Sequence, residues 1–159
     1  MSHACPAGGE RPLTPGEIAL AHSVFGTAID YARVRIKRRK WFPFQPSKVV
    51  MAPRGHLHFH PDSGSYCDDF GTASLDRQGL FIHEMTHVWQ HQNGIFLPLR
   101  RLPFSRYRYE LVRGKPLASY GIEQQAEIVR HAFLLRRGAA IAGADRAAYA
   151  RLVDFPGAS

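Results

Sequence analysis

One short pattern constrains this chain more than any other: His83 is followed directly by Glu84 and, two residues later, by His87. Residues 79–94, which read GLFIHEMTHVWQHQNG, lie in a predicted helix that begins near Ser74 or Leu75 and ends at Asn93-Gly94. Helical positions four apart lie on one face. Two imidazoles on one face can bind a single metal ion, while Glu84, rotated to the side, can accept a proton from water at that metal. The pattern therefore predicts a zinc site with His83 and His87 as ligands and Glu84 as general base.

Apolar residues surround almost the whole circumference of this predicted helix. They are Leu80, Phe81, Ile82, Met85, Val88 and Trp89. A helix that is apolar on all sides is expected to be buried. Buried imidazoles and carboxylates are costly unless something satisfies them, and a zinc ion would do so. The alternative interpretation is a pair of surface histidines that flank an acid by chance.

Length and composition point to one folded domain. A chain of 159 residues can build a core but is short for two domains, and 45% hydrophobic with 11% aromatic residues is typical of globular proteins. Residues 1–12 are rich in Gly, Pro and Ala and predict a flexible N-terminal arm, which leaves 13–159 as the domain. Cys5 and Cys67 do not have zinc-knuckle spacing, so we expect two free thiols.

The net charge of +8 suits an anionic partner such as nucleic acid, and six cations lie between Arg33 and Lys40. A solvated strand and loop explains the same cations more simply. The N-terminus lacks the apolar segment of a secretory signal, and no run approaches the length of a membrane span. The expected location is therefore the cytoplasm, or outside the cell after export without a Sec-type signal.

Several other segments carry helix or strand signals. Thr14 and Glu17 predict a capping box that opens a helix ending near Asp30. Further helices are expected over 120–137 and 145–153, and strands over 34–37, 48–52, 56–60 and 107–111.

The alternation in His56–His60 predicts a strand with Leu57 and Phe59 on one face and three histidines on the other. Two histidines two residues apart on a strand can bind a metal, so a second metal site is one hypothesis for this segment. The simpler alternative is that the histidines fill one face of an edge strand.

A later predicted helix contains Glu123-Gln124-Gln125-Ala126-Glu127. Together with HEMTH, this segment resembles the gluzincin class of zinc metallopeptidases, although Glu127 stands where that class has aspartate. The order of an LTPGE helix, a basic strand, a histidine-rich strand, FIHEMTHVWQHQ and YGIEQQAEIV is similar to bacterial Vgr-related proteins. It also resembles the metallopeptidase-like core domain of contractile injection systems. The resemblance covers most of residues 13–135.

This resemblance implies an α+β, zincin-like fold, in which a small, mainly antiparallel sheet packs on the HExxH helix with a second ligand-bearing helix beneath. It implies that Glu123 is the third zinc ligand and that Glu127 hydrogen-bonds a ligand histidine from behind. In zincins an edge strand borders the cleft and pairs with extended substrate, and residues 56–60 are the candidate here. Candidate donors to the oxyanion or substrate are Tyr109, Tyr120, His131 and His58.

The leading hypothesis is a zinc-dependent metallopeptidase that hydrolyses peptide bonds of a protein or peptide substrate, with Glu84 as general base. One alternative is a catalytically weak, zinc-stabilised binding or adaptor module of a contractile secretion system. Another is a nucleic-acid-associated protease, which the basic run between Arg33 and Lys40 would favour.

Overall fold

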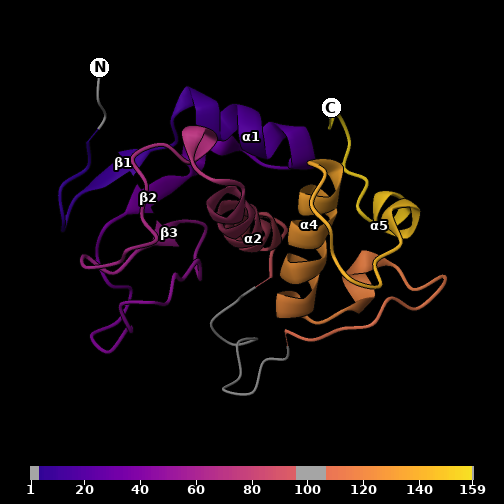
Figure 1. Cartoon of the computed structure of the whole chain (residues 1–159). Helices are drawn as coiled ribbons and strands as arrows, with labels where there is room; N and C mark the ends of the chain where they lie inside the picture. The colour runs from indigo at the N-terminus through magenta and orange to yellow at the C-terminus, as the bar shows by residue number, and fades with distance from the viewer. Residues whose placement is uncertain (1–3, 96–106, 159) are drawn as a thin grey trace.

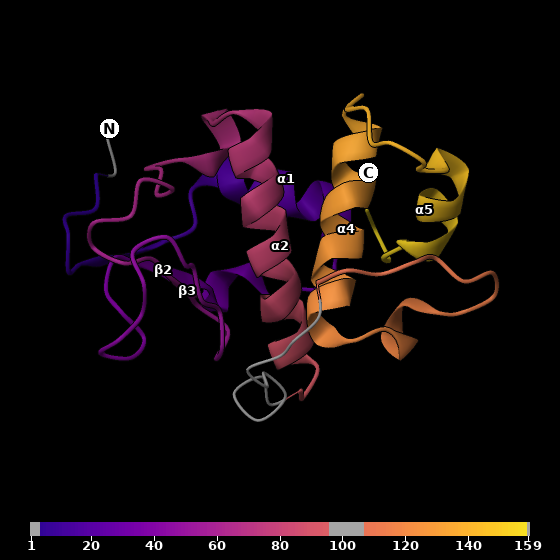
Figure 2. The same cartoon turned by 60° about the horizontal axis from the view of Figure 1, so that its bottom comes forward.

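The computed structural model describes residues 4–95 and 107–158, and this part of the chain is α+β. Its strands are β1 (Glu10–Pro12), β2 (Arg35–Lys37) and β3 (Leu57–His58), and its α-helices are α1 (Pro15–Phe25), α2 (Leu75–Gln92), α4 (Ile122–Arg136) and α5 (Arg146–Leu152). The sheet, α2, α4 and α5 follow one another across the molecule in both views, and α1 crosses behind or above α2 (Figures 1 and 2). The motif helix α2 is therefore central.

The sheet is mixed, whereas we expected it to be mainly antiparallel. Strand β2 lies in the middle and pairs antiparallel with β1, with Arg11 opposite Ile36. It pairs parallel with β3, with Ile36 opposite Leu57. The parallel pair arises because the chain makes a long excursion between β2 and β3 instead of a tight hairpin, as parallel pairing requires.

The outer edge of β3 is already paired, which corrects the expectation that residues 56–60 offer a free edge to substrate. Met51 and His58 exchange two backbone hydrogen bonds, 3.1 Å from Met51 N to His58 O and 2.7 Å in the reverse direction. The predicted strand over 48–52 contributes only this single bridge. The side chain of Gln45 also donates to the carbonyl oxygen of His58, at 3.0 Å.

Helix α1 begins as predicted, with Thr14 and Glu17 forming a capping box. It ends at Phe25, earlier than the expected end near Asp30, because Gly26 has a φ of 53° and breaks the helical path. A side chain at position 26 would lie only 2.0 Å from the carbonyl oxygen of Pro156. The close approach of the C-terminal segment therefore requires glycine there.

The predicted N-terminal arm is shorter than 1–12, because Glu10–Pro12 form β1. A buried ion pair ties this strand to α1. Arg11 donates two hydrogen bonds to Glu17, at 2.7 and 3.0 Å, and both side chains are almost fully buried. Glu17 also accepts from the backbone N–H groups of Thr14 at 2.9 Å and Phe70 at 3.1 Å. One carboxylate thus links β1, the start of α1 and the turn that precedes α2.

Helix α2 has the predicted bounds, from the N-cap Ser74 to a C-terminal turn at Asn93 and Gly94. Its apolar side chains enter a core shared with α1, the sheet and α4, in which Phe81, Ile82 and Met85 are fully buried. The opposite side of α4 packs on α5 in a second, smaller core that includes Tyr120 and Tyr149.

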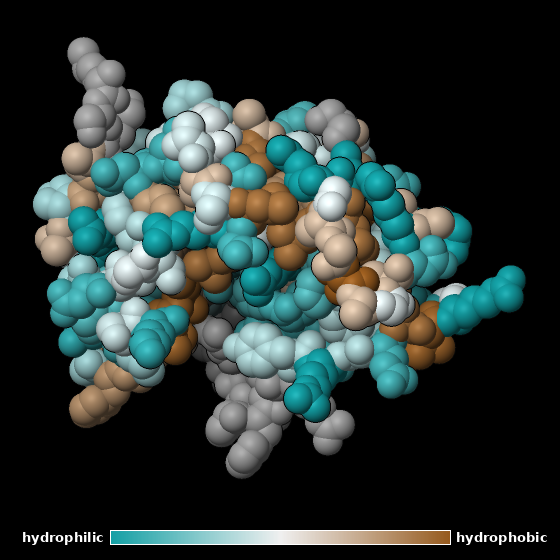
Figure 3. Space-filling model, in the orientation of Figure 1, coloured by the Kyte–Doolittle hydropathy of each residue, from teal (hydrophilic) through white to brown (hydrophobic). Residues whose placement is uncertain are grey.

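One expectation for the segment between α2 and α4 is not met. Residues 107–111, predicted as a strand, have no regular secondary structure, and residues 96–106 lie outside the described part. Cys5 and Cys67 are free thiols, as expected. Hydrophilic residues cover most of the face in Figure 3, with hydrophobic residues gathered toward its centre.

Candidate metal centre

Three side chains meet between α2 and α4, which pack side by side along their lengths (Figure 2). His83 and His87 project from successive turns of α2, and their ring centroids lie 5.1 Å apart. Glu123 projects toward them from the first turn of α4, with its Oε2 atom 3.3 Å from His83 Nε2 and 3.2 Å from His87 Nε2. One ligand atom from each residue lies within 4.8 Å of the other two.

The chemistry of this cluster fits a zinc ion. Two imidazoles and a carboxylate are a ligand set that zinc accepts with one position left for water or substrate. All three side chains are buried, at 6%, 3% and 1% exposed for His83, His87 and Glu123. Glu84 follows His83 on α2 and is also buried, at 4% exposed. Its negative charge lies close enough to raise the pKa of His83.

Opposite charges dominate the electrostatics of the cluster. Burial alone lowers the pKa of His83, but the close carboxylates of Glu123 and Glu127 outweigh it and raise that pKa to about 9. Burial raises the pKa of Glu123, yet its contacts with His83 and His87 hold the pKa well below its usual range. The carboxylate is therefore ionised and ready to bind a cation.

Gln90, one turn beyond His87 on α2, orients this histidine. Its Oε1 atom lies 2.8 Å from His87 Nδ1, and its amide donates to the carbonyl oxygen of Ile122 and to Gln125 Oε1, both at 3.0 Å. The Nδ1 atom of His87 is the donor in this arrangement, which leaves Nε2, 3.2 Å from Glu123 Oε2, as the nitrogen that a metal would use. Sequence reasoning missed Gln90, although its position three residues after a ligand histidine was a usable signal.

Glu127 occupies the corresponding place behind His83. Its Oε1 atom lies 2.8 Å from His83 Nδ1, within hydrogen-bonding range, although the contact lacks the angle of a well-formed hydrogen bond. Glu127 also lies 3.5 Å from Arg130 Nη1 and 3.5 Å from His131 Nε2. The structure thus places Glu123 and Glu127 against different nitrogens of one imidazole.

The three residues considered as oxyanion donors on or near α4 have other partners. Tyr109 and His131 contact each other at 2.5 Å, and the Tyr109 hydroxyl also lies 2.6 Å from that of Tyr149. The Tyr120 hydroxyl accepts from the backbone N–H of Val112 at 2.9 Å, within the second core. The ring of Tyr107, which sequence reasoning did not single out, stacks on His83 with centroids 6.2 Å apart.

The histidine-rich segment lies apart from this cluster. Leu57 and Phe59 are fully buried on one face, as predicted. On the other face, His56 Nδ1 accepts from Arg35 N at 3.1 Å and His60 Nδ1 accepts from Asp62 N at 3.0 Å. Among the residues that the structure describes, His58 joins no group of side chains positioned to hold a metal. His56 and His60 instead accept hydrogen bonds from local backbone N–H groups.

Much of the basic run is engaged within the fold. Arg35 and Arg39 both pair with Glu10, at 3.0 and 2.8 Å. Arg38 donates to two backbone carbonyl oxygens and lies over the ring of Tyr66. These contacts favour the structural interpretation of the run over a nucleic-acid surface.

Comparison with known proteins agrees with this architecture. The structure superposes on the effector domain of Pseudomonas aeruginosa VgrG2b with a TM-score of 0.75 and 44% identity, covering 85% of this chain and 80% of that one. The chain belongs to the VgrG2b effector-domain family. The type VI secretion system spike protein VgrG2b of that organism is 44% identical over 154 residues.

This match covers 92% of the chain but only 15% of the spike protein, so the family relationship concerns one domain of VgrG2b. No protein-family model matches the sequence. In the described ranges, none of the helices combines the length and hydrophobicity that a membrane span requires.

Proposed function

We propose that this VgrG2b-like domain is a zinc-dependent peptidase that acts on a protein or peptide substrate. The observation that carries the proposal is the convergence of His83, His87 and Glu123 within 4.8 Å of one another, with Glu84 beside them on the motif helix. A zinc ion held there would supply Lewis-acid activation of water and of a peptide carbonyl group. The likeness to the effector domain of a type VI secretion spike protein supports a role in type VI secretion.

In this proposal each residue has a separate task. Glu84 accepts the proton of the attacking water and later delivers it to the leaving amine. Glu127 and Gln90 hold the ligand histidines with Nε2 directed at the centre. Tyr107 is the preferred candidate for a donor to the developing negative charge, because its ring lies on His83 and 49% of the residue is exposed.

Hydrolysis of unfolded casein tests the proposal. The zinc-loaded domain should cleave casein, a chelator should stop cleavage, and added zinc should restore it. Glu84→Gln should retain zinc and lose about 10²–10⁴-fold in rate, the usual contribution of a general base. Cleavage by Glu84→Gln at the rate of the unchanged protein would contradict the assigned base. A zinc-loaded domain that cleaves neither casein nor other unfolded proteins would contradict a general peptidase.

The family relationship also supports a second function, a zinc-stabilised binding module of the secretion apparatus. The supporting observation is that the matched relative is a spike protein of which this domain spans only 15%. In this case the same three ligands stabilise the fold and turnover is incidental. Glu84→Gln separates the two functions, because a binding module should retain its secretion phenotype with that substitution and a peptidase should lose it. Under both proposals, we expect the domain to be exported without a Sec-type signal.

A further inference from the structure

A line of polar side chains continues from the metal cluster into the second core. It starts at His83 Nδ1, which lies 2.8 Å from Glu127 Oε1, and passes from Glu127 Oε2 to His131 Nε2 at 3.5 Å. It then runs from His131 Nδ1 to the Tyr109 hydroxyl at 2.5 Å and to the Tyr149 hydroxyl at 2.6 Å. Glu127 and His131 lie on α4, Tyr149 lies on α5, and Tyr109 lies on the segment before α4.

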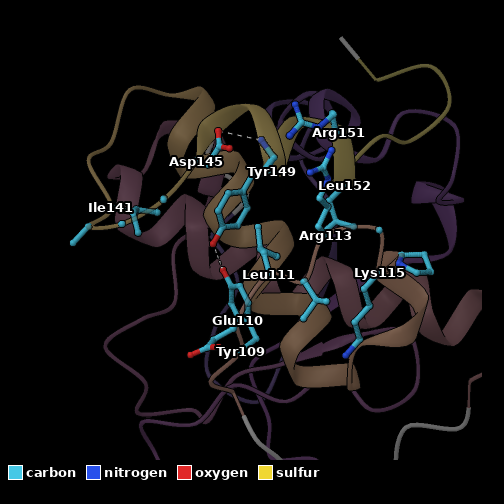
Figure 4. A pocket seen from close by; sticks show the side chains of 17 residues that line it. Tyr109, Glu110, Leu111, Arg113, Lys115, Ile141, Asp145, Tyr149, Arg151 and Leu152 are labelled. Carbon is cyan, nitrogen blue, oxygen red and sulfur yellow. Dashed lines mark hydrogen bonds between the residues drawn. The ribbon is translucent and has the colours of Figure 1, made fainter.

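Figure 4 shows the end of this line at the wall of a cavity of about 1130 Å³, between the segment 109–116 and residues 141–152. The hydroxyl groups of Tyr109 and Tyr149 point toward each other there and are joined by a dashed line. Tyr149 belongs to α5, and only 7% of the residue is exposed. Because the residue is buried in a helix, its hydroxyl is held in place against that of Tyr109.

The hydrogen-bonding capacities along the line agree with one direction. Glu127 is a carboxylate and can only accept, so the nitrogens that face it, His83 Nδ1 at 2.8 Å and His131 Nε2 at 3.5 Å, are the ones that carry protons. Neutral His131 then accepts at Nδ1 from the Tyr109 hydroxyl. The Tyr109 oxygen in turn accepts from the Tyr149 hydroxyl. Every donor points toward Glu127, so a metal would bind His83 at Nε2, in place of the proton on that nitrogen.

We propose that Tyr109, His131 and Tyr149 are positioning residues for the ligand His83, acting through Glu127. This inference rests on the proposed zinc site. The carboxylate of Glu127 has several neighbours, including Arg130 at 3.5 Å. Rotation of this carboxylate changes the contact between its Oε1 atom and His83 Nδ1. His131, held by the Tyr109 hydroxyl, which Tyr149 holds in turn, restricts that rotation. Helix α5 therefore contributes to the metal centre although none of its residues reaches the three ligands.

A structural explanation of the same contacts makes a different prediction. If the tyrosine hydroxyls only satisfy one another inside the second core, their removal changes stability and leaves zinc affinity alone. If they act through Glu127, their removal weakens zinc binding only while Glu127 is present. Double-variant cycles distinguish these cases, because residues that act through a shared partner are not additive.

The test is the zinc dissociation constant, measured by competition with a chromophoric chelator, for Tyr149→Phe and Tyr109→Phe alone and with Glu127→Ala. Loss of Glu127 should weaken zinc binding about 10–100-fold, the usual effect of a partner behind a ligand, and each Tyr→Phe change should give a smaller loss of about 3–10-fold. In the Glu127→Ala background the Tyr→Phe changes should have no further effect. Tyr120→Phe, in the same core, is the matched control and should leave zinc affinity unchanged.

A pair of substitutions at His131 keeps the test decisive if a tyrosine variant folds poorly. His131 is only partly buried, so it should tolerate replacement. His131→Leu removes the donor to Glu127 and should weaken zinc binding, whereas His131→Gln keeps an N–H donor and should restore most of the affinity. Equal zinc affinity in all these variants, or equal losses with and without Glu127, would overturn the inference while leaving the peptidase proposal intact. Failure of the unchanged protein to bind zinc would instead contradict the proposed function itself.

Discussion

Glu123 and Glu127 lie one turn apart on α4, and their carboxylates meet different atoms of the same histidine. Glu123 Oε2 faces His83 Nε2 at 3.3 Å, whereas Glu127 Oε1 faces His83 Nδ1 at 2.8 Å. An imidazole that binds a metal through one nitrogen commonly donates a hydrogen bond through the other. The two glutamates are therefore suited to different roles, one as a ligand and one as the partner that orients a ligand.

Alanine substitution at these two positions should separate the roles. Glu123→Ala removes one of only three protein ligands and should abolish stoichiometric zinc binding. Glu127→Ala should leave binding detectable but weaken it about 10–100-fold. Zinc titration of both variants gives the answer, with circular dichroism to check that each is folded. The opposite ranking would mean that the two assignments are reversed.

The site residues that are close together in sequence could be predicted, and those far apart in sequence were harder to predict. His83, Glu84 and His87 are close in sequence, and helical geometry alone places them together. Glu123 is 36 residues beyond His87, and it was chosen through a resemblance to a known class. Tyr107 was missed because its role depends on how the segment before α4 packs against α2, which no local pattern encodes. Gln90 was missed although its spacing from His87 on the same helix was a local signal.

At the scale of secondary-structure elements, the buried pair between Arg11 and Glu17 connects β1 to α1. Breaking such a pair leaves the remaining charge buried and uncompensated, which typically costs about 3–5 kcal/mol. Glu17→Ala should therefore lower the free energy of unfolding by about that amount, as measured by urea denaturation. Glu10→Ala is the matched control, because Glu10 lies next to Arg11 on β1 and its ion pairs with Arg35 and Arg39 are exposed. A similar, small effect of both substitutions would contradict the importance of the buried pair.

His58 on β3 should make the fold sensitive to acid. Burial and the nearby charge of Lys37 lower the pKa of this buried side chain from 6.5 to about 4. Between these values the unfolded chain binds a proton that the folded chain does not, so stability falls as the pH drops from 6.5 to 4 and is unaffected above that range. After allowance for solvent screening, the loss should be on the order of 2 kcal/mol.

Urea denaturation in chelator across this pH range provides the measurement. His58→Gln removes the titrating group and should show a smaller loss of stability between pH 6.5 and 4. If the two proteins lose stability in parallel, protonation of His58 does not contribute to acid unfolding.

The helices of this chain were easier to predict than its strands. The start of α1 and both ends of α2 carry local signals, such as the capping box of Thr14 and the glycine at position 94. The strands are two or three residues long, and their pairing depends on distant partners. The alternation in His56–His60 correctly identified the buried face but not the strand's length or the bridge from Met51.

At the scale of the whole molecule, a metal bound between α2 and α4 would join the two halves of the chain. A ligand that binds only the folded state stabilises it by about 2.7 kcal/mol at a concentration 100 times its dissociation constant. Zinc at that concentration should therefore raise the Tm by about 5–10 °C for a domain of this size. Differential scanning fluorimetry would detect the shift, and magnesium should not produce it. His87→Ala should lose the zinc-dependent shift; an equal shift in that variant would place the ion elsewhere.

The proposed function depends on one zinc ion held by His83, His87 and Glu123. The most direct test is a crystal structure of the zinc-loaded domain with anomalous diffraction data on both sides of the zinc absorption edge. We expect a single strong anomalous peak between α2 and α4, about 2.0–2.2 Å from a nitrogen of each histidine and an oxygen of Glu123. A peak bound by other residues, or no peak in this cluster from protein crystallised with excess zinc, would contradict it.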